Sequence, residues 1–369
     1  MANTKITNPE LFNLGANNTA ATQLPVMTTT QRTAMTGLSI GEMIFNSTTD
    51  KVEYFDGTKW YGITYENTSP AALTFDFAMA AGGGAGGRYY YGGGGGAGGY
   101  RTSFGTGNLS GRNSAVLNAI DFTTLTDFRV VIGSGGTINP STNGTYTQIF
   151  DHITGLFSHR CEGGGYGAGS TSTGAYAGNG GSGGGIDDYG GQVAAGTGTA
   201  NQGYSGGSGV SGTFRYAGGG GGAGEPGTAS SSTLVLAGKG GNGMQSLITG
   251  TSTYYAGGGG GASNAGVSAG GGLGGDGGGG QGAIYSYATP SMSAGTANTG
   301  GGGGGGTHSR GSDFYGAPGG SGFVILRYPA AVSLDIGTAS ASVLNASVAG
   351  NSSFKYSIIT QSGDCKFLN

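Results

Sequence analysis

The amino-acid sequence predicts a mainly β protein with little α-helix. A short helix and a β-meander come first, and a β-sandwich-like domain with long glycine-rich insertions follows. Short segments that alternate apolar and polar residues are separated by clusters of turn residues, which is typical of β-strands. Glycine accounts for 90 of the 369 residues. Aromatic residues reach 10% and charged residues only 9%, the opposite of a disordered chain, so we expect an ordered protein.

Changes in composition divide the chain into four parts. Residues 1–23 are polar, and residues 24–68 form a helix-and-meander module. Residues 69–329 form a glycine-rich β domain, whose longest glycine-rich insertion spans about 163–322. Residues 330–369 form a C-terminal β segment that closes this domain or contacts a neighbour.

The module at residues 24–68 contains one helix and three strands. Threonine residues are able to cap a short helix that begins near Thr30. The segments EMIF, KVEYF and KWYGI then alternate apolar and polar residues between Asn-, Asp- and Gly-rich turns, which predicts a three-stranded meander. Trp60 is the only tryptophan. It serves either as the anchor of a small core or as a platform for a ligand.

The glycine-rich domain contains further apolar strands. The insertion between them is much longer than the ~12–15 residues of an ordinary structureless loop, so it must have a structure of its own. The predicted strands are Leu73–Met79, Phe128–Ile132, 147–150, 155–162 and Phe323–Tyr328.

The seven consecutive glycines at Gly300–Gly306 pose the main structural question, because they bury no side chain. Only backbone hydrogen bonds and close packing remain to stabilise them. A bundle of polyglycine II helices supplies both, since a threefold extended helix without side chains permits contact on all sides. Seven residues would span about 22 Å at a rise of about 3.1 Å per residue. A flexible linker is the alternative.

Tyrosines recur within the long insertion at a nearly constant interval. Tyr176, Tyr216 and Tyr255 are 40 and 39 residues apart, and each is followed by a glycine-rich run. A fixed interval between similar segments is typical of stacked repeats. We therefore expect structurally equivalent passes of the chain.

Charge and hydropathy exclude several classes of partner. The net charge is −3 and no basic block exists, so we expect no nucleic-acid partner. No apolar run approaches the ~20 residues of a membrane helix, so we expect no membrane insertion. The first residues lack the apolar core of a signal peptide. Cys161 and Cys365 are interpreted as ordinary thiols rather than as a disulfide.

No constellation of residues indicates catalysis, a cofactor or a metal. Gly-x-Gly-x-x-Gly matches arise by chance in so glycine-rich a chain, and AGKGG at 237–241 lacks the Ser or Thr of a phosphate-binding loop. The three histidines show no metal-ligand spacing. Asp187 and Asp188 are adjacent rather than placed across a cleft, as a pair of glycosidase carboxylates would be. We expect a protein that is not an enzyme.

Recognition by aromatic side chains is the function that the residues favour. Tyrosine combines a rigid apolar face with a polar tip, which is why binding loops are rich in it. These rings could instead cap the glycine bundle and shield its ends. The candidate receptor-binding residues are Tyr89, Tyr90, Tyr91, Tyr254, Tyr255, Tyr285, Tyr287, Phe314 and Tyr315.

Two segments carry a resemblance to a known family. Residues 24–63 resemble the helix-and-hairpin module of bacteriophage tail-fibre and other virion proteins. The segment GGSGFVILRYP at 319–329 resembles the glycine-rich domain of phage fibre proteins. The resemblance implies a virion protein made in the host cytoplasm, a homotrimeric fibre or tip adhesin. Residues 1–23 would then attach it to other virion proteins, and the glycine-rich domain would bind a host surface glycan or outer-membrane protein.

Two other functions remain open. A structural or decoration protein of the tail or capsid would share this organisation without a receptor of its own. An enzyme that cleaves host glycans would release soluble saccharide.

Overall fold

The chain forms two compact units, Met1–Ala71 and Ala72–Asn369, which are described separately. Strands dominate both units, which confirms the mainly β fold class. No helix in the described ranges has the length and apolar character that a membrane span requires. The computed structural model describes residues 24–63, 74–88, 91–105, 107–121, 127–153, 155, 158–169, 176–187, 194–210, 215–233, 236–263, 270–284, 291–309 and 312–368.

The first unit contains the predicted helix and meander. Thr28 caps the helix, and the side chain of Gln31 accepts a hydrogen bond from the Thr28 amide in return. The helix and the three strands of the meander are therefore confirmed, whereas the parallel pairing of a further short strand with β2 was not predicted. The elements are β1 (Val26–Met27), α1 (Thr29–Thr33), β2 (Met43–Asn46), β3 (Lys51–Phe55) and β4 (Trp60–Ile63).

A buried ion pair joins the helix of this unit to its sheet. Arg32 donates to the carboxylate of Glu53, whose side chain is only 5% exposed. Asn46 and Thr49 donate to the other carboxylate oxygen. Burial alone would raise the pKa of Glu53, but these hydrogen bonds and the guanidinium charge hold it below its usual value. On the neighbouring strand, the ring of Trp60 packs 5.5 Å from that of Phe55.

The second unit is built on two antiparallel sheets. The first has the order β17-β18-β15-β5-β6, and β7 (Ile120–Asp121) also pairs with β5. Its strands are β5 (Thr74–Ala80), β6 (Tyr100–Thr102), β15 (Phe323–Pro329), β17 (Ser340–Val348) and β18 (Asn351–Gln361). The second sheet has the order β10-β9-β8-β19-β16. Its strands are β8 (Asp127–Val131), β9 (Thr147–Phe150), β10 (Ser158–Cys161), β16 (Ser333–Asp335) and β19 (Gly363–Leu368).

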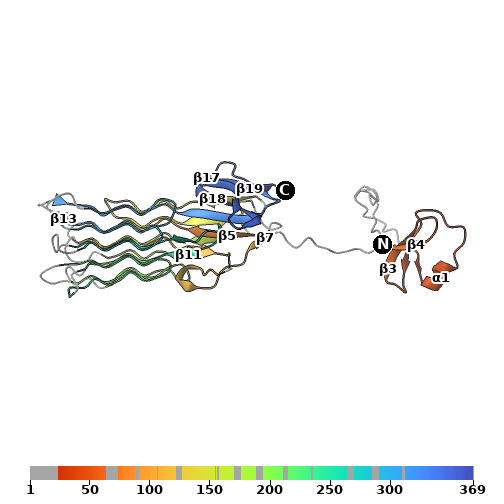
Figure 1. The fold of residues 1–369 in the computed structure, drawn as a ribbon, viewed down its shortest axis with the longest axis horizontal. Helices are drawn as coiled ribbons and strands as arrows, with labels where there is room; N and C mark the ends of the chain where they lie inside the picture. The colour runs from red at the N-terminus through yellow and green to blue at the C-terminus, as the bar shows by residue number, and fades with distance from the viewer. Residues whose placement is uncertain are drawn as a thin grey trace. The chain divides into compact units, whose positions relative to one another are not determined.

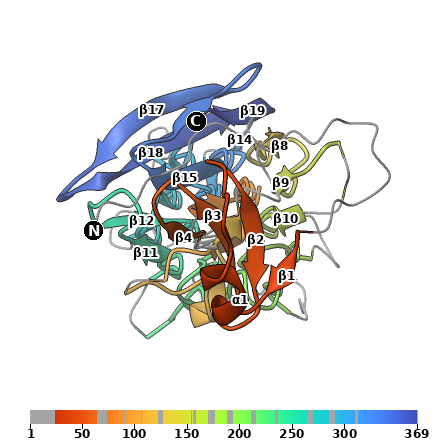
Figure 2. The ribbon, with the colours of Figure 1, turned by 90° about the vertical axis from the view of Figure 1, so that its right-hand side faces the viewer.

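The C-terminal strands belong to both sheets. β18 pairs with β15 in the first sheet, and β19 pairs with β8 in the second. In Figure 2, β18 lies beside β15 and β19 lies beside β8. Of the two roles considered for this segment, the structure therefore shows that it closes the domain.

The main hydrophobic core lies between these sheets. Phe75 of β5 packs 4.8 Å from Phe367 of β19, ring centre to ring centre. Cys161 and Cys365 are buried in this core as free thiols. The other face of the first sheet carries a second core, in which Tyr255 packs 4.5 Å from Phe323. This face is covered by a hairpin of β11 (Met244–Ser246) and β12 (Thr253–Tyr255).

Glycine-rich segments continue directly from the strands. Residues 81–87 follow β5, residues 92–99 precede β6, and residues 162–168 follow β10. Figure 1 shows these segments running side by side from the sandwich to the opposite end of the unit. At that end lie two short strands, β13 (His308–Ser309) and β14 (Ser312–Asp313).

The hydrogen bonds of the glycine-rich segments repeat every three residues. Along residues 92–99, each third amide donates to the same neighbour, and successive amides reach segments 300–306, 162–168 and 218–221 in turn. The carbonyl groups of 92–99 accept from a different set of three neighbours, namely segments 81–87, 182–185 and 256–262. Six hydrogen-bonded neighbours around a threefold helix are what a polyglycine II bundle requires. The bundle forms within a single chain.

Gly300–Gly306 also lies inside this bundle. Its amides donate to carbonyl groups of four segments, including Gly84 and Gly87 on one side and Gly257 and Gly260 on another. A Cβ atom built on Gly302 would lie 2.0 Å from the carbonyl oxygen of Gly95. No side chain fits there, because real Cβ atoms do not approach backbone within 3.0 Å. The run of glycines is thus required by the packing.

The segments that follow Tyr216 and Tyr255 are stacked passes of one bundle, as expected, but they are not equivalent in direction. Ala217 donates to Ala262, Gly220 to Gly259 and Ala223 to Ala256, so segments 216–224 and 255–263 run antiparallel. The similar sequences arise because every buried pass of a glycine bundle needs the same residues, whichever way the chain runs.

Candidate functional site

The described aromatic candidates lie at the two opposite ends of the glycine bundle. Tyr91 pairs with Thr307, and the amide of Phe314 donates to the carbonyl of Thr307, which places Tyr91, Phe314 and Tyr315 beside β13. Tyr254 and Tyr255 lie on β12, at the sandwich. Four candidates, Tyr89, Tyr90, Tyr285 and Tyr287, lie outside the described residues.

The glycine helix between the two ends sets their separation. The amide of Ala256 donates to Thr299, so Tyr255 lies at the level where Gly300–Gly306 begins. Tyr91 pairs with Thr307, where that run ends. Seven residues at a rise of about 3.1 Å separate the two levels by about 22 Å. The described aromatic residues therefore form two groups and not one continuous site.

The side chains of these aromatic residues differ in exposure. Tyr254 is 43% exposed and Tyr315 is 37% exposed, whereas Tyr255 is 9% exposed and belongs to the second core. Burial raises the pKa of the Tyr255 hydroxyl. The guanidinium of Arg215 lies 5.3 Å from the centre of the Tyr91 ring, within the range of a cation–π contact. The receptor-binding role of these residues stays a prediction.

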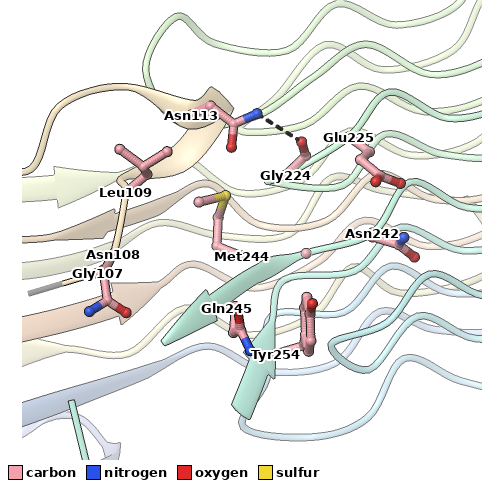
Figure 3. A pocket seen from close by; sticks show the side chains of 11 residues that line it. Gly107, Asn108, Leu109, Asn113, Gly224, Glu225, Asn242, Met244, Gln245 and Tyr254 are labelled. Carbon is pink, nitrogen blue, oxygen red and sulfur yellow. Dashed lines mark hydrogen bonds between the residues drawn. The ribbon is translucent and has the colours of Figure 1, made fainter. Parts of the chain in front are cut away.

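A pocket of about 350 Å³ lies next to Tyr254, at the junction of the sandwich and the glycine bundle. The side chains of Tyr254 and Gln245 lie side by side in Figure 3, because the two residues pair across the β11–β12 hairpin. The complete lining is Gly107, Asn108, Leu109, Asn113, Gly224, Glu225, Asn242, Gly243, Met244, Gln245 and Tyr254.

Backbone hydrogen bonds hold the wall opposite the hairpin. The amides of Gly224 and Glu225 both donate to the carbonyl of Asn242, at 2.9 and 3.0 Å. The side-chain amide of Asn113 donates to the carbonyl of Gly224 at 3.4 Å, as Figure 3 shows. The polar groups of the pocket are therefore attached to a rigid framework.

The polar lining is mostly uncharged. Amide side chains come from Asn108, Asn113, Asn242 and Gln245, and Glu225 supplies a carboxylate. None of the residues that line the pocket is basic. Such a lining forms hydrogen bonds with a polar, uncharged molecule. In the described part of the chain, no group of three His, Cys, Asp or Glu side chains is arranged to hold a metal.

Sequence reasoning identified only Tyr254 among the residues of this pocket. The other lining residues come from segments near residues 107–113, 224–225 and 242–245, which are separated by long stretches of the sequence. Single Asn and Gln residues in turns form no sequence pattern from which their proximity in the folded protein could be predicted.

Comparisons with known proteins gave two family matches. The model of a glycine-rich domain matches residues 61–329, and that of a phage tail-like trimerisation region matches residues 5–74. No curated protein and no solved structure matches the chain. The second match supports a homotrimer and a component of a phage tail.

Proposed function

Because this chain belongs to the glycine-rich domain family and also matches a phage tail-like trimerisation region, we propose that it is a fibre or tip protein of a phage tail. In this proposal the N-terminal part attaches the protein to the particle. The glycine-rich domain binds a receptor on the host cell surface.

The packing of the glycine bundle is the observation that best supports the proposed receptor-binding role. Each helix is hydrogen-bonded on several sides, so the bundle is a rigid support with little side-chain chemistry of its own. Recognition in such proteins falls to the residues that a rigid scaffold presents at its surface. Tyr315 at one end and Tyr254 at the other are exposed aromatic residues of this kind.

Binding of the full-length protein to host cells tests the proposal. We expect labelled trimer to bind host cells saturably and to compete with phage adsorption. A deletion of residues 163–322 is unsuited to this test, because these residues supply many hydrogen-bonded neighbours of the 92–99 and 300–306 helices. Point variants such as Tyr315→Ala and Tyr254→Ala are preferable, with Leu273→Ala, another exposed residue, as the control.

The alternative is a structural or decoration protein of the virion. Folded trimer that neither binds host cells nor competes with phage would favour this alternative. Attachment to the particle is tested separately, with a variant that lacks residues 1–23. The trimerisation match begins at residue 5, so sedimentation first checks that this variant is still a trimer. We expect the variant to be absent from virions.

A further inference from the structure

The pocket beside Tyr254 combines one exposed aromatic ring with amide groups and a carboxylate. We propose that it binds a neutral saccharide, one or two sugar residues long, of a host surface glycan. The role of this binding in host attachment rests on the proposed function, but the binding itself is independent of it. The volume of about 350 Å³ lies within the range of small-molecule sites.

Tyr254 supplies the apolar surface that a sugar ring needs. Its side chain is 43% exposed and stands on a hairpin strand whose next residue, Tyr255, is anchored in the core. The pocket also includes the side chain of Met244, which is 6% exposed. A tyrosine ring offers an apolar face to the C–H groups of a sugar and a hydroxyl to its oxygens, at little cost in conformational entropy.

Existing hydrogen bonds orient two of the amide side chains. The Oδ1 atom of Asn242 accepts from Nζ of Lys239 at 3.0 Å and from the amide of Asp276 at 3.1 Å. These bonds leave the NH₂ group of Asn242 to donate to a ligand. Gln245 donates through Nε2 to Ser252, which leaves its Oε1 atom as an acceptor. A donor and an acceptor in fixed positions suit sugar hydroxyls, which do both.

The third amide faces the pocket from the opposite wall. Asn113 donates through Nδ2 to the hydroxyl of Tyr204 at 3.2 Å and to the carbonyl of Gly224 at 3.4 Å. Its Oδ1 atom is therefore a further acceptor for ligand hydroxyls. Because both walls are held by bonds within the protein, the ligand does not have to order them, which favours affinity.

Charge selects among the possible sugars. Glu225 is exposed, and its backbone is held by Gly222 and Asn242. The lining has one carboxylate and no basic residue, so it supplies no cation to pair directly with a phosphorylated or acidic sugar. Neutral hydroxyl groups, in contrast, donate well to a carboxylate. The pocket therefore favours neutral sugars over uronic and sialic acids.

The test uses the full-length protein and sugars of known structure. Saturation-transfer NMR is recorded with glucose, galactose, N-acetylglucosamine and lactose, and with glucuronic acid and sialic acid as acidic counterparts. We expect at least one neutral sugar to bind and both acidic sugars to fail. Tyr254→Ala and Gln245→Ala should each weaken that binding about tenfold or more, while Tyr315→Ala, at the other end of the glycine bundle, should not change it. Circular dichroism checks that each variant is folded.

Several outcomes overturn the inference. They are no binding of any neutral sugar at millimolar concentration, preference for an acidic sugar, or equal binding by folded Tyr254→Ala and Gln245→Ala variants. Host-cell binding is measured in parallel. If the protein binds host cells but no neutral sugar, the saccharide site is wrong and the proposed function is retained. If the protein binds a neutral sugar but not host cells, the receptor role is wrong and the saccharide site is retained.

Discussion

Gly302 packs so closely on Gly95 that a Cβ atom at Gly302 would lie 2.0 Å from the Gly95 carbonyl oxygen. We therefore expect Gly302→Ala to destabilise the second unit by about 3 kcal/mol or more, since the clash is with backbone inside a packed bundle. Gly270→Ala is the matched control, because a Cβ atom there meets none of the described residues within 4 Å. It should change the stability by no more than about 0.5 kcal/mol. Thermal unfolding monitored by circular dichroism measures the stability of both variants. Equal melting temperatures would contradict the close packing of Gly302 on Gly95.

The amides of Gly300–Gly306 should exchange slowly with solvent. Six of them donate to backbone carbonyls, and the Gly301 amide donates to Oγ1 of Thr299 at 3.2 Å. Hydrogen exchange through such bonds requires opening of the bundle, so we expect rates at least about 100-fold below those of a peptide of sequence 299–307. Mass spectrometry of the full-length protein provides the measurement. Peptide-like rates would mean that the segment behaves as a linker.

Acid should weaken the first unit through Glu53. Hydrogen bonds from Arg32, Asn46 and Thr49 outweigh burial and place its pKa in the folded protein below the usual 4.5. The corresponding stability is present above pH 4.5 and is lost as the pH falls through the lowered pKa. Trp60 is the only tryptophan and lies in this unit, so its fluorescence reports this unfolding alone.

Glu53→Gln tests the same ion pair at neutral pH. The variant should lose about 1.5–3 kcal/mol, the usual contribution of hydrogen bonds to a charged group. Its stability should also lose the dependence on acid. The exposed Asp50→Asn, in the same unit, serves as a control. If Glu53→Gln kept the wild-type dependence of stability on acid, that dependence would come from other carboxyl groups.

Removal of residues 1–71 should convert the trimer into a monomer. The trimerisation match covers residues 5–74, whereas the second unit has its own cores and its own glycine bundle. Sedimentation velocity distinguishes the two states, and circular dichroism checks that the remaining unit is folded. A trimer that persists without these residues would place the subunit contacts in the glycine-rich part.

Local patterns predicted most of the strands correctly. The segment TQIF at 147–150 coincides with β9, and the prediction for Phe323–Tyr328 is one residue shorter than β15. Both are short runs between turn residues, so the residues next to each strand in the sequence are sufficient to predict it. Polyglycine II packing was expected for the glycine-rich insertions, of which residues 163–322 are the longest, and the bundle also contains residues 81–87 and 92–99.

Composition and short-range pattern were sufficient to establish a β-rich, glycine-packed chain with a helix-and-meander module. Backbone conformation and alternation of side chains are local properties, and a run without side chains permits few ordered structures. The direction of each glycine pass, the separation of Tyr91 from Tyr254 and the pocket at the sandwich became visible in the folded molecule alone. Identical glycines carry no information about which neighbour they contact, so the strands at their ends determine that arrangement.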